Sequence, residues 1–114
     1  FLAQPDCTGQ RATLVVSCND KFGFSAAPLI VDGAVIGGTL GGQILILDAS
    51  TGAMINKLDT IGPVTPINKE IAGKGGSIDS HGISAGAGMV FVSSGYSAFG
   101  QTGGNALIAY RPKQ

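Results

Sequence analysis

The stretch Ser25–Thr60, SAAPLIVDGAVIGGTLGGQILILDASTGAMINKLDT, decides the fold class of this chain. Its apolar runs are short, and turn residues separate them at Asp32-Gly33, at 37–42 and at 48–52. An Asp-Gly pair between apolar runs predicts a tight hairpin, because glycine accepts the positive φ that such a turn needs. The pattern therefore predicts four short antiparallel strands, at 27–31, 34–36, 44–47 and 53–58. Four such strands are the content of one β-propeller blade.

These residues also resemble the blade repeat of the pyrroloquinoline-quinone (PQQ) enzymes. That repeat runs strand, DG, strand, GT, DG, strand, and then an LDAxTG corner, which matches Leu47 to Gly52 here. The later stretches 75–82, 93–96 and 104–110 resemble the C-terminal end of the polyvinyl-alcohol-dehydrogenase-like branch. The resemblance covers residues 22 to 112. It implies an all-β propeller and PQQ-dependent alcohol oxidation, with a calcium ion beside the quinone in the complete propeller.

One departure from that repeat concerns the docking of one blade onto the next. In the family a tryptophan that follows the corner, near Asn56 in this chain, makes that contact, but this chain contains no tryptophan. Losing a large aromatic side chain weakens packing unless other side chains fill the space. We expect Leu58 or Met54 to substitute for it in part.

The composition narrows the function classes. With 44% hydrophobic and 12% charged residues, the 114-residue chain has enough apolar material for a folded domain and too little charge for a disordered one. Its formal net charge is zero and no basic stripe is present, so nucleic acid is not an expected partner. No apolar run approaches the roughly 18 residues of a membrane-spanning helix. Nineteen glycines fit a protein with many turns.

The first segment, residues 1–24, contains both cysteines of the chain. The spacing of Cys7 and Cys18 fits no metal-binding pattern, and the low-charge composition suits an exported protein, so we predict a Cys7–Cys18 disulfide. Two unrelated free thiols are the alternative. Because the sequence opens at Phe1 without a methionine, we expect a mature, processed or partial chain of a secreted protein, extracellular or periplasmic.

The remaining residues divide into three parts. Residues 25–60 are the first blade unit, and residues 61–76 are a connector in which Pro63 and Pro66 disfavour a central strand. The run Gly73–Gly76 is expected to be flexible or to form a turn. Residues 77–114 are a second blade unit, in which Gly88 aligns with Gly33 and an enlarged loop spans 93–105. That loop is either a binding element or a surface loop whose aromatics pack over a neighbour.

The richest polar cluster is Ser77-Ile-Asp79-Ser80-His81. On one strand Asp79 and His81 would share a face and Ser80 would oppose them, so a hydrolase triad is not favoured. One histidine with two distant cysteines also lacks the spacing of a zinc site. The PQQ resemblance implies Asp79 as the catalytic base, with cofactor-binding residues Ser77, His81, Tyr96 and Asn105. The alternative for Asp79 is structural, as an acceptor for backbone donors in a turn.

Two blades cannot bury their own broad faces, since repeat arrays of fewer than about three units are not expected to be stable. The sequence therefore predicts partners, either the remaining propeller blades or other copies of the chain. The first functional interpretation is a C-terminal part or small subunit of an exported quinoprotein-like propeller that is not catalytic on its own. The second is a non-catalytic structural or binding propeller, or a strand-assembled protein, that has lost the cofactor site.

Overall fold

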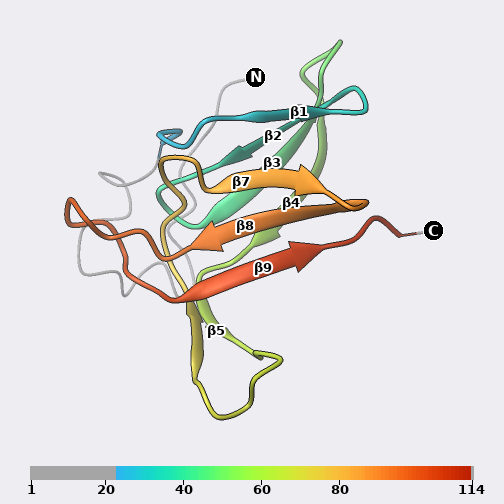
Figure 1. Ribbon diagram of the computed structural model, residues 1–114. Coiled ribbons are helices and arrows are strands. Elements are labelled where there is room, and N and C mark those ends of the chain that lie inside the picture. The colour runs from blue at the N-terminus through green and yellow to red at the C-terminus, as the bar shows by residue number, and fades with distance from the viewer. Residues whose placement is uncertain (1–22, 114) are drawn as a thin grey trace.

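The computed structural model describes residues 23–113, which form three antiparallel β-sheets and no helix (Figure 1). The first sheet has the order β1-β2-β3-β4 and the third the order β7-β8-β9, while β5 and β6 pair as a ribbon between them. The strands are β1 Leu29–Val31, β2 Ala34–Gly38, β3 Gln43–Asp48, β4 Met54–Asp59, β5 Gly62–Val64, β6 Gly73–Gly75, β7 Ile83–Gly86, β8 Met89–Ser94 and β9 Ala106–Tyr110. The all-β prediction and the four strands of the first unit are confirmed. The predicted Cys7–Cys18 disulfide lies outside the described residues.

Tight turns of the same kind join the first two strands in both large sheets. Asp32 and Gly33 have φ values of 48° and 75°, and they join β1 to β2. Ala87 and Gly88, with φ values of 51° and 72°, join β7 to β8. Two consecutive residues with positive φ are typical of the primed turn whose twist matches that of paired strands. The hairpin predicted at Asp32-Gly33 is therefore confirmed, and the sequence alignment of Gly33 with Gly88 corresponds to equivalent positions.

The corner between β3 and β4 is organised by one carboxylate. Asp48 Oδ1 accepts hydrogen bonds from Ser50 N at 2.9 Å, Ser50 Oγ at 2.6 Å and Thr51 N at 2.9 Å. Gly52, with a φ of 74°, donates its N–H to the Asp48 carbonyl at 2.8 Å. These bonds stabilise the ionised carboxylate, and the hydrogen bond from Ser50 Oγ contributes most to lowering the pKa of Asp48 from 3.8 to about 2.

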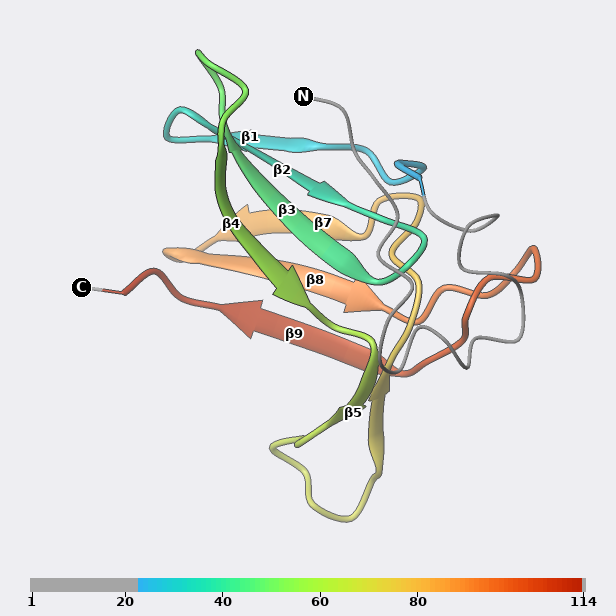
Figure 2. The same cartoon turned by 180° about the vertical axis from the view of Figure 1, so that it is seen from behind.

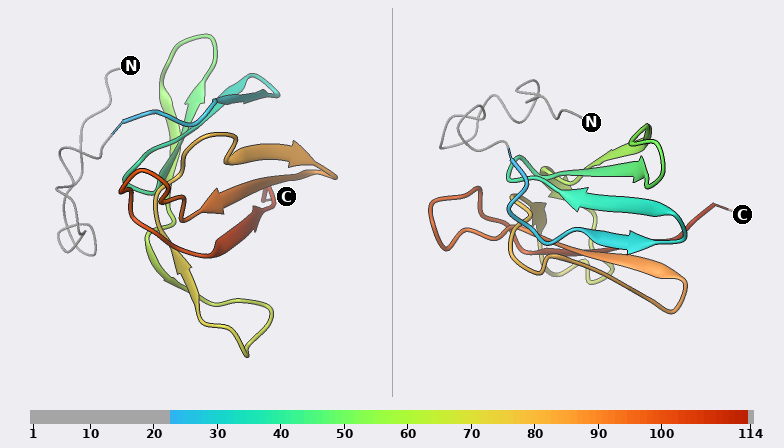
Figure 3. Two further views of the ribbon diagram at one scale, coloured as in Figure 1. Left: turned by 60° about the vertical axis from the view of Figure 1, so that its left-hand side comes forward. Right: turned by 90° about the horizontal axis from the view of Figure 1, so that it is seen from above.

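The two large sheets stack face to face around a shared apolar core (Figure 3). Ile36 and Ile44 contribute from the first sheet, Ile83 and Val92 from the third, and Ile78 lies fully buried with them. The sheets meet closely because Gly38 has no side chain. A Cβ there would lie 2.3 Å from Ile78 Cγ2, which is well inside a normal contact distance. A residue larger than glycine would push the layers apart.

Each sheet also has a second apolar face, turned away from this core. Side chains alternate along a strand, so Leu45 and Leu47 lie opposite Ile44 and Ile46. Leu47 shares this outer face with Val35 and with Phe24, which is 48% exposed. On the third sheet Leu107 is opposite in orientation to the core-facing Ile108 and is 71% exposed. These faces are the structural reason to expect neighbouring sheets.

Two expectations about the second half of the chain were wrong. The run Gly73–Gly76 contains strand β6, because its backbone pairs with Gly62–Val64. Residues 79–82 form a turn in which Ser80 has a φ of 57°, so the face-sharing argument for Asp79 and His81 does not apply. The second blade unit stays a prediction: within the described residues the third sheet has three strands, and a propeller blade has four.

The side chains expected to replace the tryptophan behave differently from each other. Leu58 packs against the core, whereas Met54 is 44% exposed. Leu58 therefore fills part of the contact between the two sheets, and Met54 does not.

No helix in residues 23–113 is long and apolar enough to cross a membrane.

The corner carboxylate gives a pH-dependent contribution to stability. Because the folded pKa of Asp48 is lowered to about 2, its contribution is present above the unfolded value of 3.8 and is lost as the pH falls through about 2. We expect Asp48→Asn to lower the free energy of unfolding near pH 6 and to have a much smaller effect near pH 2, measured by urea denaturation.

The matched control is Asp32→Asn, which replaces a turn carboxylate that accepts none of these corner hydrogen bonds. A stability difference between wild type and Asp48→Asn that stays the same from pH 6 to pH 2 would contradict this role of Asp48.

Candidate functional site

The candidate site lies where three connecting segments meet at one end of the two large sheets. These segments are 39–42 between β2 and β3, 76–82 between β6 and β7, and 95–105 between β8 and β9, and we call this region the loop end. Figures 1 and 2 show the three segments together from opposite sides. The sequence-predicted residues Ser77, Asp79, His81, Tyr96 and Asn105 all belong to the loop end.

Ser77 is fully buried and connects the other two segments. Its Oγ donates to the Leu40 carbonyl at 2.5 Å and accepts from Thr102 N at 2.9 Å. Its carbonyl accepts from Gly95 N at 2.8 Å and Tyr96 N at 3.1 Å. Both functions of the hydroxyl are therefore used in joining the β2–β3 turn to the enlarged loop, and the side chain does not face an open site.

The carboxylate of Asp79 accepts hydrogen bonds from nearby residues of the loop end. Its Oδ1 accepts from Ser80 N at 2.6 Å, and its Oδ2 accepts from Gln101 Nε2 at 2.7 Å. Hydrogen bonding from the Ser25 side chain makes the largest contribution to lowering the pKa of Asp79, followed by smaller contributions from Ser80 and Gln101 against a desolvation effect that raises it. A lowered pKa makes the carboxylate a weaker proton acceptor, so this environment does not favour a general base.

The other three predicted residues have separate roles and do not form one cluster with Asp79. Asn105 Oδ1 accepts from Lys74 N at 2.8 Å and its Nδ2 donates to the Ala72 carbonyl at 2.9 Å, so both ends of the amide hold β6. Tyr96 is 37% exposed and its ring lies 6.5 Å from that of Phe99, tilted by 41°. His81 is exposed. The structure therefore brings Asp79 together with Gln101 and not with Asn105.

A buried hydroxyl pair, which the sequence did not indicate, ties the two sheets together at this end. Thr60 Oγ1 lies 2.7 Å from Ser94 Oγ and donates to the Gly42 carbonyl at 2.7 Å. Ser94 Oγ also accepts from Gly76 N at 2.9 Å. Thr60 and Ser94 are 1% and 3% exposed, so these bonds form away from water. Thr60 is 18 residues from Gly42 and 34 residues from Ser94 in sequence, and no local sequence pattern reveals such pairs.

The quinone and calcium ion that the resemblance implies would need free polar atoms at the loop end. A hard cation needs several oxygen ligands, yet both polar ends of Asn105 and both functions of the Ser77 hydroxyl bond to the chain itself. Within residues 23–113 no three His, Cys, Asp or Glu side chains gather closely enough to hold a metal ion. The polar side chains of Ser77 and Asn105 are therefore engaged in hydrogen bonds within the chain and are not free to bind such an ion.

Comparison with known proteins adds no assignment to this geometry: no family model, curated protein or solved structure matches the chain.

The hydroxyl pair gives a stability prediction. We expect Ser94→Ala to lower the free energy of unfolding by about 1–3 kcal/mol, because it leaves the buried Gly76 N–H without its acceptor. The control is Ser93→Ala at the neighbouring exposed position, which should change stability by less than about 0.5 kcal/mol. Urea denaturation measures both, and equal effects at the two positions would show that the buried bonds carry no net stability.

Proposed function

We propose that this chain is a two-blade sector of a β-propeller related to the quinoprotein enzymes, and that it builds the wall of that propeller and is not catalytic on its own. The observation that carries the proposal is the stacking of the first and third sheets in the same orientation. Strand β7, the first of its sheet, lies beside β1 and β2 of the preceding sheet. In a propeller, successive sheets stack in this way around a central channel.

The apolar outer faces support the same proposal. Ile30 points away from the core because Leu29 and Val31 pack against it, and Ile30 is 71% exposed. Together with Val35 and Leu47 it gives the first sheet an outer surface suited to another sheet. A face-to-face stack of only two such sheets leaves the outer apolar face of each sheet without a neighbour. The partners we propose are further blades, from the rest of a longer protein or from other copies.

The quinoprotein relationship is carried by the repeat residues, from the Asp32-Gly33 turn to the Asp48 corner. Oxidation of an alcohol by a PQQ-containing propeller is the activity that this relationship implies for the complete protein. Since Ser77 and Asn105 are engaged in hydrogen bonds within the chain, a quinone site in that protein would need further side chains from outside this pair. The location of the protein, predicted to be secreted, stays a prediction.

A second candidate function is a structural or binding propeller without a cofactor. The hydrogen bonds to Asp79 favour it, because the carboxylate that the resemblance assigns to catalysis is bonded to Ser80 and Gln101. The exposed Tyr96 and Phe99 rings on the enlarged loop would then be available for binding. Both candidates share the two-blade architecture and differ only in chemistry.

The architecture predicts association through the outer faces. We expect the wild-type chain to sediment as an assembly, and Ile30→Lys to weaken that association at least tenfold, because a charge would be buried against the neighbouring sheet. The control Ala49→Lys places the same charge in the exposed corner. Sedimentation velocity across a concentration series measures the effect, and urea denaturation checks that both variants stay folded. A wild-type chain that remains monomeric at all concentrations would contradict the sector proposal.

The two candidates are separated by cofactor chemistry. If the quinoprotein interpretation is correct, the complete assembly mixed with PQQ and calcium should show a bound-quinone absorbance and dye-linked oxidation of alcohols. The chain of residues 1–114 alone should show neither. Absence of both signals from the complete assembly would remove the enzyme interpretation and leave the structural one.

A further inference from the structure

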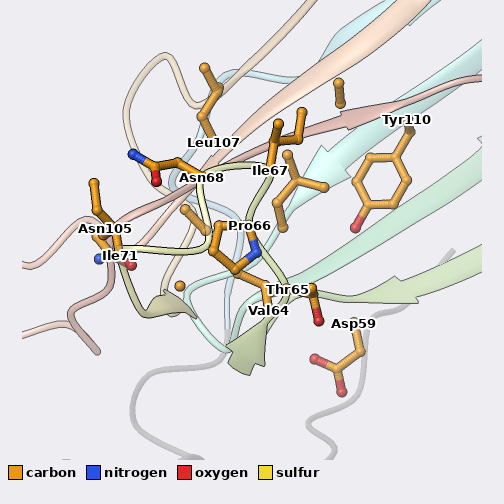
Figure 4. Close-up of a pocket in the computed structure, with 14 residues that line it drawn as sticks. Asp59, Val64, Thr65, Pro66, Ile67, Asn68, Ile71, Asn105, Leu107 and Tyr110 are labelled. Atoms are coloured by element: carbon orange, nitrogen blue, oxygen red, sulfur yellow. The ribbon is translucent and has the colours of Figure 1, made fainter.

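The segment 95–105, which connects β8 to β9, is fixed at its base. Gly104 N donates to the Gly95 carbonyl at 3.1 Å and closes the base of the loop. Asn105, which Figure 4 shows among the residues that line the groove between β9 and the β5–β6 loop, holds β6 through its side-chain amide. Beyond this base, residues 96–100 are all exposed, and we call them the tip. The position of the tip therefore needs a cause other than burial.

The buried Ser77 holds the chain on both sides of the tip. Tyr96 N donates to the Ser77 carbonyl at 3.1 Å. Thr102 N donates to Ser77 Oγ at 2.9 Å, and Ser77 N donates to the Thr102 carbonyl at 2.8 Å. Between these two fixed points, no hydrogen bond to the rest of residues 23–113 is found for Ser97, Ala98 or Gly100.

One side chain connects the tip to the rest of the molecule. Gln101 Oε1 accepts from Phe99 N at 2.7 Å, and Gln101 Nε2 donates to Asp79 Oδ2 at 2.7 Å. The amide thus uses one polar end on the tip and the other on the connector between β6 and β7. These two bonds form a relay from the backbone of Phe99 through Gln101 to the carboxylate of Asp79.

The carboxylate at the end of this relay is itself firmly placed. Asp79 Oδ1 accepts from Ser80 N at 2.6 Å, and the Ser25 side chain also donates to the carboxylate. These bonds, that from Ser25 above all, lower the pKa of Asp79, so the group is ionised near neutral pH. The bond from Gln101 is therefore charge-assisted and stronger than a bond between two neutral groups.

Glycines at the two ends of the tip supply its freedom to move. Gly95 has a φ of 129° and Gly100 a φ of 82°, values that glycine adopts far more readily than other residues. Hinges of moving loops are a few residues that absorb large changes in φ and ψ. With the relay formed the tip is held between these glycines, and without it the tip has no other bond that fixes its direction.

We propose that Gln101 is a latch that holds the tip against Asp79, with a closed state in which the relay is formed and an open state in which it is broken. Gln101 is a positioning residue, because it fixes the backbone of Phe99 and so keeps the Phe99 ring 6.5 Å from that of Tyr96. The inference concerns bonds within this chain and does not depend on the quinoprotein relationship. A closed tip would also lower the cost of ordering the loop around a partner, a consequence that rests on the binding interpretation.

Backbone ¹⁵N relaxation of the full chain tests the latch. In wild type the order parameters of residues 97–100 should be close to those of the sheets, near about 0.85, and in Gln101→Ala they should fall below about 0.6. The nuclear Overhauser contacts between the Tyr96 and Phe99 rings should be lost in the same variant. The amide signals of Ile44 and Val92, two residues of the core, report that the sheets stay folded.

An exchange of charge between the two partners separates the relay from a role in packing alone. Gln101→Glu places a second carboxylate against Asp79, and Asp79→Asn leaves one oxygen for two donors, so each change alone should mobilise the tip. In the double variant the new amide at position 79 donates to the new carboxylate at position 101, which still accepts from Phe99 N. The order of the tip should therefore return, as coupled partners in a double-mutant cycle require.

Ala98→Glu is the matched control, because it places the same carboxylate elsewhere on the exposed tip and should keep wild-type order parameters. Three results would each overturn the proposal while Ile44 and Val92 report folded sheets. They are a mobile tip in wild type, an ordered tip in Gln101→Ala, and a double variant whose tip is as mobile as in the single variants.

Discussion

Burial of apolar surface on both faces of each sheet is the constraint on which the rest of this structure depends. Strand β3 carries Ile44 and Ile46 on one face and Leu45 and Leu47 on the other, so no arrangement of a single sheet hides both. The contact with the third sheet covers one face, and it is close enough to require glycine at position 38 beside Ile78. The other face stays apolar, so the hydrophobic effect that joins these two sheets also favours contact with a further sheet from outside this pair.

The buried hydrogen bonds at the loop end are a consequence of the close contact between the two sheets. Bringing two sheets together buries the backbone of the segments that connect them, and each buried N–H or C=O then needs a partner. Ser77, Thr60 and Ser94 supply those partners with short hydroxyl side chains that fit between the layers. The polar cluster that first suggests chemistry in the sequence is therefore, in the main, the means by which the ends of the sheets are closed.

The parts of the fold that could be predicted from sequence are those specified by neighbouring residues. The Asp32-Gly33 turn and the corner after Asp48 depend on backbone conformation within a few positions, so residue type alone indicates them. The β5–β6 ribbon could not be predicted, because Gly73–Gly75 has no strand pattern and pairs only through its backbone with Gly62–Val64. The Thr60–Ser94 contact was hidden for the same reason, since long-range hydroxyl pairs leave no periodicity.

The same distinction decides how far the quinoprotein resemblance reaches into function. Asp48 holds a corner and Gly33 permits a turn, so backbone geometry alone explains these two residues of the repeat. A protein could keep every one of them for its architecture while its chemistry changed. Evidence for catalysis would have to come from loop-end oxygens that are free to meet a ligand, yet the side chains of Ser77 and Asn105 are bonded within the chain. The architecture and the chemistry of this chain are therefore separate inferences, and only the first is supported by packing.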